Sequence, residues 1–235
     1  MVTRVKVVSS GSQLALIDRY RPLKIEDCFL TANVRKHLQH HYDNGLSYHL
    51  VFYGSTGVGK TTVARILSRH YELHEYKLDG SGSVVDEIKK SITSGSLFGN
   101  KAKLYVLDEF QNATKRDEMA MASLLEDYNG NARFILITND VSKLTEQAIS
   151  RSRQIDFSIC LYDEDTDKIK HFKRFGKDEF WSELNRLADR VLIGEKVDEK
   201  KHQIIKDKVF SNNYWISDLR RFINALDDGI NGLLD

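Results

Sequence analysis

Eight consecutive residues, from Gly54 to Thr61, have the types and the spacing that hold the phosphates of a nucleotide. They read Gly-Ser-Thr-Gly-Val-Gly-Lys-Thr, and the glycines allow successive backbone N–H groups to turn toward a phosphate. Lys60 would reach the β- and γ-phosphates, and Thr61 would place a hydroxyl on Mg²⁺. An apolar run before the loop and a helical pattern after it make a glycine-rich turn without a ligand the weaker alternative. The predicted nucleotide-binding residues here are Gly54, Ser55, Thr56, Gly57, Val58, Gly59, Lys60, Thr61 and Thr62.

A pair of carboxylates, Asp108 and Glu109, follows the apolar run Leu104–Leu107. Ligands of parallel sheets bind at the carboxyl ends of the strands, so this pair would lie beside the phosphate loop. Asp108 would complete the Mg²⁺ site with Thr61, and Glu109 would orient and deprotonate a water molecule. Activation of water is typical of an ATP hydrolase, whereas a kinase must exclude water. Without the phosphate loop, an exposed acidic strand end would be the simpler interpretation.

Asn139 follows another apolar run, Phe134–Thr138, and would stand at the same edge of the sheet. Its amide could polarise or position the attacking water. Asn is also common in turns after strands, because its side chain forms hydrogen bonds with nearby backbone groups. The residue types alone leave both interpretations open.

The elements that must position these residues alternate between buried strands and helices. Such an alternation favours right-handed crossovers and a parallel sheet with helices on both faces, which is a three-layer α/β domain. The predicted strands are Leu50–Tyr53, Tyr76–Leu78, Leu104–Leu107, Phe134–Thr138 and Ile155–Phe157, and the predicted helices are Thr61–Tyr71, Val84–Thr93 and Glu118–Tyr128.

Beyond about Leu161 the strand pattern stops, and the rest of the chain has helical periodicity. The helices expected there are Thr166–Arg174, Lys177–Ile193, Asp198–Phe210 and Ser217–Leu234. The chain is therefore predicted to contain an α/β nucleotide-binding domain at residues 1–160 and a small all-helical domain at residues 161–235.

The composition excludes several classes of protein. Hydrophobic residues make up 41% and charged residues 29% of the 235 residues, which is typical of a soluble globular protein. The 35 basic and 34 acidic residues balance, so no bulk positive charge indicates a nucleic-acid or membrane partner. No apolar stretch is long enough to span a bilayer. Cys28 and Cys160 lie far apart, which argues against a disulfide framework or a zinc site and favours a reducing, cytoplasmic location.

Several short motifs taken together resemble the AAA+ ATPases, and within them the clamp-loader subunits of DNA replication, especially the bacteriophage type. The resemblance covers most of the chain and implies a P-loop ATPase domain with a parallel sheet, followed by a helical lid. Its marks are Tyr20-Arg21-Pro22, His49–Thr62, Asp108-Glu109-Phe110, Thr138-Asn139, Ser150–Arg153 and Asp218–Arg221.

The resemblance assigns roles to individual residues. Asn139 falls at the first sensor of the γ-phosphate, and Arg220 falls at the second sensor, which projects from the lid. Arg151 falls at the arginine finger, which in this family reaches the ATP of a neighbouring subunit, and the nearby Arg153 is the alternative. The guanidinium suits this role because it is always charged and its donors are arranged as a fork.

The same resemblance indicates contacts with adenine and with DNA. Tyr20 and Pro22 resemble the loop that packs near adenine, although an ordinary turn would have the same residues. Ser83 and Lys89, at the start and in the middle of a predicted helix, would bind the phosphate backbone of DNA. A solvated lysine on an amphipathic helix is the alternative for Lys89.

The implied function is Mg²⁺-dependent, DNA-stimulated hydrolysis of ATP that opens a sliding clamp and places it on primer-template DNA. The expected partners are the clamp, the DNA backbone and other clamp-loader subunits. The alternatives are another AAA+ DNA-remodelling ATPase, such as a helicase loader or branch-migration motor, or an assembly subunit that binds ATP with little turnover. The sequence ends at Asp235, before the family's C-terminal collar, so a truncated chain or a reduced family member is expected. A viral member would act in the cytoplasm of its host cell.

Overall fold

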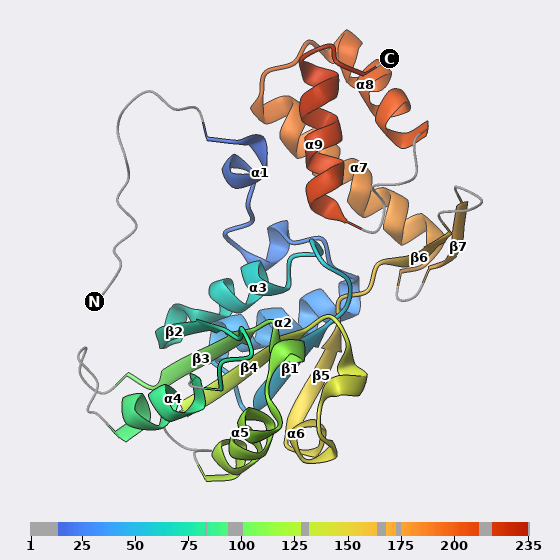
Figure 1. The fold of residues 1–235 in the computed structure, drawn as a ribbon. Coiled ribbons are helices and arrows are strands. Elements are labelled where there is room, and N and C mark those ends of the chain that lie inside the picture. Colours follow the sequence, from blue (N-terminus) through green and yellow to red (C-terminus); the bar gives the residue numbers. More distant parts are fainter. Residues whose placement is uncertain are drawn as a thin grey trace.

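The computed structural model describes residues 14–82, 84–93, 101–127, 132–163, 168–172, 175–211 and 218–234. A five-stranded sheet with its helices occupies the lower part of Figure 1, and three helices near the C-terminus occupy the upper part. The N-terminal segment runs between these two parts before it enters the sheet domain.

The sheet is parallel at every strand pair, with the order β2-β3-β4-β1-β5. The three central strands are almost fully buried because helices cover both faces of the sheet. The strands are β1 (His49–Tyr53), β2 (Glu72–Lys77), β3 (Lys103–Asp108), β4 (Ala132–Thr138) and β5 (Ser152–Asp156).

Alternate side chains of each central strand enter two different hydrophobic cores. In β1, Leu50 and Phe52 join the core that contains residues of α2 and α3, whereas Val51 joins the core that contains residues of α4 and α5. The side-chain period of two therefore produces one layer of helices on each face. This confirms the predicted three-layer α/β architecture. The helices of this part are α2 (Ala32–Asn44), α3 (Lys60–Leu67), α4 (Val84–Thr93), α5 (Lys115–Asp127) and α6 (Glu146–Ser150).

The two edge strands begin earlier than the sequence predicts. The β2 strand starts at Glu72 instead of Tyr76, and β5 starts at Ser152 instead of Ile155. The added positions are mostly polar and partly or fully exposed, because an edge strand has solvent on one side. A search for apolar runs therefore finds the buried strands and misses the polar beginnings of the edge strands.

Two helix ends also differ from prediction. The helix α3 ends at Leu67 and continues only as a 3₁₀ turn, Ser68–His70. The helix α5 begins at Lys115, three residues before the predicted start, because Thr114 and Asp117 form a capping box. The backbone N–H of Thr114 donates to Oδ2 of Asp117 over 3.2 Å, and the backbone N–H of Asp117 donates to the Thr114 hydroxyl over 3.2 Å.

The predicted helix Thr166–Arg174 is wrong. The structure has an antiparallel hairpin there, in which β6 (Cys160–Asp163) pairs with β7 (Lys168–Phe172). A helix of nine residues is marginal without tertiary support, whereas a strand can pair at once with the adjacent segment. The C-terminal part is therefore a hairpin followed by helices, and the strand pattern does not stop at Leu161.

Three helices form the rest of the C-terminal part: α7 (Lys177–Gly194), α8 (Glu199–Ser211) and α9 (Leu219–Ile230). Their buried residues include Phe180 and Phe222, which belong to the same core cluster as residues of α2 and α3. Phe29 connects the two parts, because its ring lies 5.8 Å from the ring of Phe180. The short helix α1 (Leu16–Arg19) contacts α9. We call α7 to α9 the lid.

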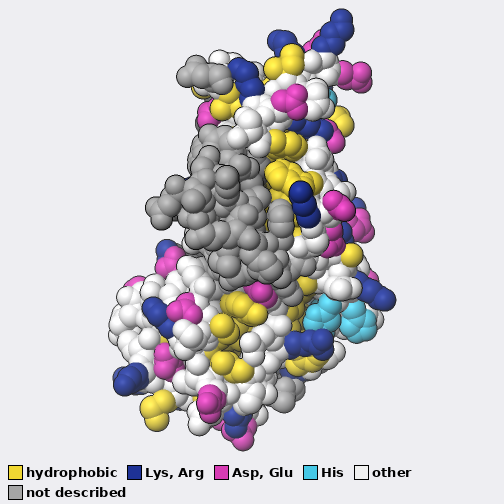
Figure 2. Space-filling model, turned by 90° about the vertical axis from the view of Figure 1, so that its right-hand side faces the viewer, with side chains coloured by type: hydrophobic (Ala, Val, Ile, Leu, Met, Phe, Trp, Pro, Cys, Tyr) yellow, Lys and Arg dark blue, Asp and Glu magenta, His cyan; other side chains and the backbone are white. Residues whose placement is uncertain are grey.

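The surface carries charges of both signs. Figure 2 shows acidic and basic side chains intermixed on one face, which agrees with the balance of 35 basic and 34 acidic residues. Among the described residues, no helix combines the length and the apolar character that a membrane span needs.

Candidate nucleotide site

The predicted phosphate loop forms the turn between β1 and α3. Gly57 and Gly59 have φ values of 77° and 95°, in the left-handed region that favours glycine. Gly54 has a φ of 133°, and a Cβ atom there would lie 2.7 Å from the backbone nitrogen of Ser158. Glycine is therefore required at these positions for the loop to adopt this conformation at the start of α3.

Lys60 is the first residue of α3, and only 7% of it is exposed. Its Nζ donates to the carbonyl oxygens of Gly54 (2.6 Å) and Ser55 (2.7 Å) and to Oδ1 of Asn139 (3.0 Å). Burial lowers the pKa of Lys60 to about 8, because desolvation disfavours the charged ammonium. A bound anion would offset this cost, so the position suits a phosphate ligand.

Thr61 and Asp108 meet beside Lys60. The Thr61 hydroxyl, on α3, donates to Oδ2 of Asp108, at the end of β3, over 2.7 Å. A hydroxyl and a carboxylate side by side are the hard oxygen ligands that Mg²⁺ prefers, so these residues fit the metal. Among the described residues, no three His, Cys, Asp or Glu side chains form a metal site. Mg²⁺ would therefore take further ligands from the phosphates of a nucleotide.

Glu109 has a φ of 55°, which is uncommon for a residue other than glycine. Its Oε1 forms an ion pair with Nζ of Lys77 (3.0 Å), and its Oε2 accepts a hydrogen bond from Nδ2 of Asn112 (3.3 Å). Lys77 is opposite Asp108 in the β2–β3 register, which explains why it reaches the next residue. Residue types near Glu109 did not indicate Lys77, because the pairing of β2 with β3 brings it there. Asn112 reaches Glu109 through the 3₁₀ turn Phe110–Asn112, which directly follows Glu109.

Asn139 lies directly after β4, and strand order puts β4 next to β1 and the phosphate loop. Besides its contact with Lys60, its backbone N–H donates to Oε1 of Gln111 over 3.2 Å. The structure therefore brings Asn139 to the predicted phosphate site. Its role as a sensor of the γ-phosphate stays a prediction.

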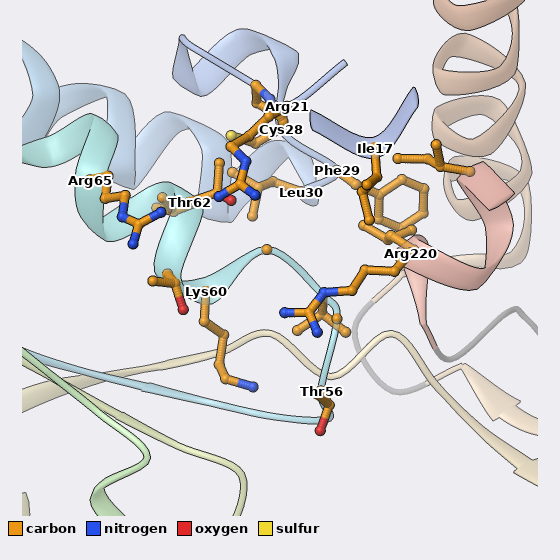
Figure 3. A pocket seen from close by; sticks show the side chains of 18 of the residues that line it. Ile17, Arg21, Cys28, Phe29, Leu30, Thr56, Lys60, Thr62, Arg65 and Arg220 are labelled. Carbon is orange, nitrogen blue, oxygen red and sulfur yellow. The ribbon is translucent and has the colours of Figure 1, made fainter. Parts of the chain in front are cut away.

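The lid contributes Arg220, in the first turn of α9. Figure 3 shows its guanidinium extending from the lid toward the loop that carries Thr56 and Lys60. The preceding Asp218 caps α9 by accepting the N–H of Arg220 at 2.8 Å. A Cβ atom on Gly57 would collide with the carboxylate of Asp218, so the glycine also allows the lid to approach the phosphate loop.

These groups line one end of a cavity of about 450 Å³, which is in the size range of small-molecule sites. The other end is largely apolar, and Figure 3 shows Ile17, Cys28, Phe29 and Leu30 there. We call it the base end, because an apolar slot beside a phosphate site suits a nucleobase. The predicted residues Tyr20 and Pro22 also line the cavity. Sequence analysis missed Ile17, Cys28, Phe29, Leu30, Leu187 and Ile223, since buried apolar residues give the same pattern in a core and in a pocket.

Two titratable groups at the base end are neutral at physiological pH. Burial, together with Glu195, which accepts a hydrogen bond from its hydroxyl at 2.8 Å, raises the pKa of Tyr20 to about 12. Burial likewise raises the pKa of the Cys28 thiol to about 12. Neither Tyr20 nor Cys28 supplies charge to the cavity, which is also lined by Arg21, Asp27 and Arg190.

The two candidate finger arginines lie outside this cavity. Arg151 follows α6 and forms an ion pair with Glu126 of α5 at 2.7 Å. Arg153 lies on β5, with its guanidinium carbon 5.7 Å from the ring centroid of Tyr48. Arg151 is partly exposed and Arg153 is exposed, so both are accessible from outside the chain. Their role in a neighbouring subunit stays a prediction.

Of the two predicted DNA-binding residues, the structure describes Lys89, which does not line the cavity. Lys89 is exposed on α4, and Ser83 lies outside the described residues. The structure therefore leaves the prediction of DNA contact through Lys89 open.

Comparison with known proteins places the chain in a family. Residues 50–161 match the model of the ATPase family associated with various cellular activities (AAA). The chain is 28% identical over 225 residues to replication factor C small subunit 2 of Pyrobaculum arsenaticum, with 92% of this chain and 63% of that protein covered. It is 26% identical over 236 residues to the sliding-clamp-loader large subunit of Escherichia phage RB69, with 97% and 69% covered. The chain spans less than two thirds of the length of the Pyrobaculum relative.

Solved structures share the fold. The Thermotoga maritima RuvB Holliday junction branch migration motor superposes with a TM-score of 0.55 at 16% identity, with 88% of this chain and 72% of that chain covered. At this identity the likeness concerns the fold alone. Together with the phosphate loop, the sheet order and the lid, these matches give one conclusion: residues 50–161 form an ATPase domain of the AAA family, and the chain as a whole is similar to clamp-loader subunits.

Proposed function

We propose that this chain is an ATP-hydrolysing subunit of a clamp loader, which opens a sliding clamp and places it on primer-template DNA. One observation supports the proposal that the chain hydrolyses ATP. Lys60, Thr61, Asp108 and Asn139 come from three separate elements and meet through hydrogen bonds of 2.7 to 3.0 Å at one end of a cavity. The names of the relatives support the clamp-loader part.

The triphosphate would bind at the loop between β1 and α3. Backbone N–H groups of the loop and the positive end of α3 favour an anion there. Lys60 would exchange its carbonyl partners, Gly54 and Ser55, for phosphate oxygens. Arg220 would approach the phosphates from the lid, and the base would occupy the apolar end.

Hydrolysis would depend on Glu109 as the base that accepts a proton from the attacking water. Both of its oxygens have partners, Oε1 with Lys77 and Oε2 with Asn112, and each oxygen has a further lone pair that would accept the proton. Thr61 and Asp108 would hold Mg²⁺, which supplies neutralisation of phosphate charge when bound. Asn139 would keep Lys60 oriented toward the phosphates.

Two substitutions test the ATPase proposal. Lys60→Ala should abolish nucleotide binding, because it removes the buried cation of the phosphate loop. Glu109→Gln should preserve binding and reduce hydrolysis on the order of a hundredfold or more, since a general base contributes ~10²–10⁴. Calorimetric titration with ATP and steady-state ATPase assays measure the two effects. Unchanged turnover in Glu109→Gln would contradict the role of this carboxylate.

The proposed action on a sliding clamp and on DNA needs a separate experiment. We propose that Lys89, on α4, contacts the phosphate backbone of DNA. Other subunits of the assembly would contribute similar contacts. ATPase activity should rise with primer-template DNA and rise further with a cognate clamp, and Lys89→Ala should reduce the salt dependence of DNA binding. Stimulation by branched DNA without any effect of a clamp would favour a different AAA DNA-remodelling ATPase.

A further inference from the structure

Arg190 of the lid helix α7 binds the backbone of the segment that forms the base end. Its Nη2 donates to the carbonyl oxygen of Tyr20 (2.6 Å), and its Nη1 donates to the carbonyl oxygen of Asp27 (3.2 Å). The same Nη1 lies 3.5 Å from Oδ1 of Asp27, and 28% of the Arg190 side chain is exposed. The guanidinium of Arg190 thus connects Tyr20 and Asp27 to the lid.

The segment between α1 and α2 has little regular structure to determine its shape. It contains one 3₁₀ turn, Ile25–Asp27, and Cys28 and Phe29 of the base end follow this turn directly. Its conformation therefore depends on contacts with neighbouring elements. Arg190 makes such contacts before the turn, at Tyr20, and at the last residue of the turn, Asp27, and it also lines the cavity.

A second arginine strengthens this attachment from the same face of α7. Arg186, one helical turn before Arg190, donates to the carbonyl oxygens of Glu26 (3.0 Å) and Cys28 (3.2 Å). Arg186 does not line the cavity, and 43% of its side chain is exposed. Of these two arginines, Arg190 is therefore the one that both binds the segment between α1 and α2 and lines the cavity.

The Nε atom of Arg190 is buried and has no hydrogen-bond partner among the described residues. Most buried polar groups in native proteins have a partner, so such an atom in a cavity-lining residue calls for one. Because solvent does not reach this atom, a ligand in the cavity would reach it only after neighbouring groups move.

We propose that Arg190 is a positioning residue for recognition of the nucleobase. By holding the carbonyl groups of Tyr20 and Asp27 against the lid, it shapes the base end only when the lid is docked. Movement of the lid then changes the affinity for the base, and base binding stabilises the docked lid. The inference rests on the proposed nucleotide site and adds to it the residue that couples lid position to base recognition.

The test compares ligands with and without a base. Binding of ATP, ADP and inorganic tripolyphosphate to the full chain is measured by calorimetry, in wild type and in Arg190→Met. The variant should bind ATP and ADP at least about tenfold more weakly, by the same factor, because hydrogen bonds from a charged donor are lost. Its affinity for tripolyphosphate should be unchanged. Equal weakening of ATP and tripolyphosphate, or unchanged ATP affinity, would overturn the proposal.

Two further variants make the test specific. Arg190→Lys keeps the charge but lacks the fork that reaches two carbonyl groups, so it should lose part of the ATP affinity and none of the tripolyphosphate affinity. If Arg190→Met fails to fold, Arg190→Lys provides the test in its place. Lys208→Met is the matched control, because Lys208 donates to the carbonyl oxygen of Leu234 (2.8 Å) within the lid and away from the cavity. It should bind all three ligands as wild type does.

Failure of the proposed function gives a different result. If wild type binds neither ATP nor tripolyphosphate, the nucleotide site itself is wrong. If wild type binds both and Arg190→Met binds both equally well, only the role of Arg190 is wrong.

Discussion

Lys60 combines a charged group with burial, and this combination has a consequence for pH. Its pKa of about 8 in the free protein lies well below the ordinary lysine value, because burial disfavours the ammonium. Phosphates beside the ammonium would raise that pKa again. Nucleotide binding is therefore expected to take up a proton wherever the free protein has a neutral Lys60.

The affinity for ATP should therefore fall as pH rises above about 8. Below that pH, Lys60 is already charged and binding requires no proton. Above it, each pH unit should weaken binding by up to about tenfold, because one proton must be taken up. Calorimetry between pH 7 and 9.5 in two buffers of different ionisation enthalpy measures both affinity and proton uptake. Lys60→Arg should lack the inflection, since arginine stays charged; an inflection retained in that variant would assign it to another group.

At the scale of elements, His49 connects two strands and a helix. The backbone N–H of Phe134, on β4, donates to Nδ1 of His49, at the start of β1, over 3.2 Å. Nε2 of His49 then carries the proton and donates to the carbonyl oxygen of Leu125, on α5, over 3.1 Å. Burial lowers the pKa of His49 to about 4, and the charge of Arg133 adds to this effect. The histidine is therefore neutral in the folded protein, and protonation at Nδ1 would break the bond to β4.

The expected result is a loss of stability as pH falls from about 6.5 to about 4. In this window the unfolded chain binds a proton at His49 and the folded chain does not, so lower pH favours unfolding. The loss from this group amounts to roughly 3 kcal/mol at most. Urea unfolding at pH 7, 6 and 5 measures it. His49→Gln should have lower stability at pH 7 and a shallower pH dependence, and an equally steep dependence in that variant would exclude His49 as the cause.

At the scale of the whole molecule, the predicted arginine finger is expected to act on the ATP of a neighbouring subunit. Arg151 lies outside the cavity, paired with Glu126, and the resemblance assigns it to the site of a neighbouring subunit. Arg151→Ala should then leave ATP binding nearly intact and reduce hydrolysis by roughly 10³–10⁵, the contribution typical of arginine fingers. The chain as a monomer should hydrolyse ATP slowly, with a specific activity that rises with protein concentration.

A mixture of two inactive variants tests action between subunits. Arg151→Ala keeps an intact ATP site, and Lys60→Ala keeps an intact finger, so an assembly of both should recover activity. Steady-state ATPase is measured over a range of ratios, with primer-template DNA and clamp present. Arg153→Ala is the matched comparison, because Arg153 lies two residues away, beside Tyr48. No activity above the sum of the separate variants would contradict a finger in trans, and rescue with Arg153→Ala instead would assign the finger to Arg153.

The sequence alone determined the parts of the site that are local. Gly54–Thr61 and Asp108-Glu109 are contiguous residues whose types already specify their chemistry, and apolar runs mark the central strands that carry them. Parallel strands present their carboxyl ends at one edge, so the meeting of Thr61 with Asp108 also followed from the sequence. The division of domains at residue 160 stays a prediction, as do the roles of the sensor and finger residues.

Only the tertiary structure decided the base end, the ion pair of Glu109 with Lys77 and the attachment of the lid. Tyr20 and Glu195 form a hydrogen bond although 175 positions separate them, and no local pattern indicates such a pair. Lys77 meets Glu109 because β2 pairs with β3, and Arg190 meets Tyr20 because the segment between α1 and α2 packs against α7. The hairpin β6–β7 likewise depended on pairing between two segments. Local sequence specifies which groups a segment offers, whereas contacts between distant segments depend on how the whole chain packs.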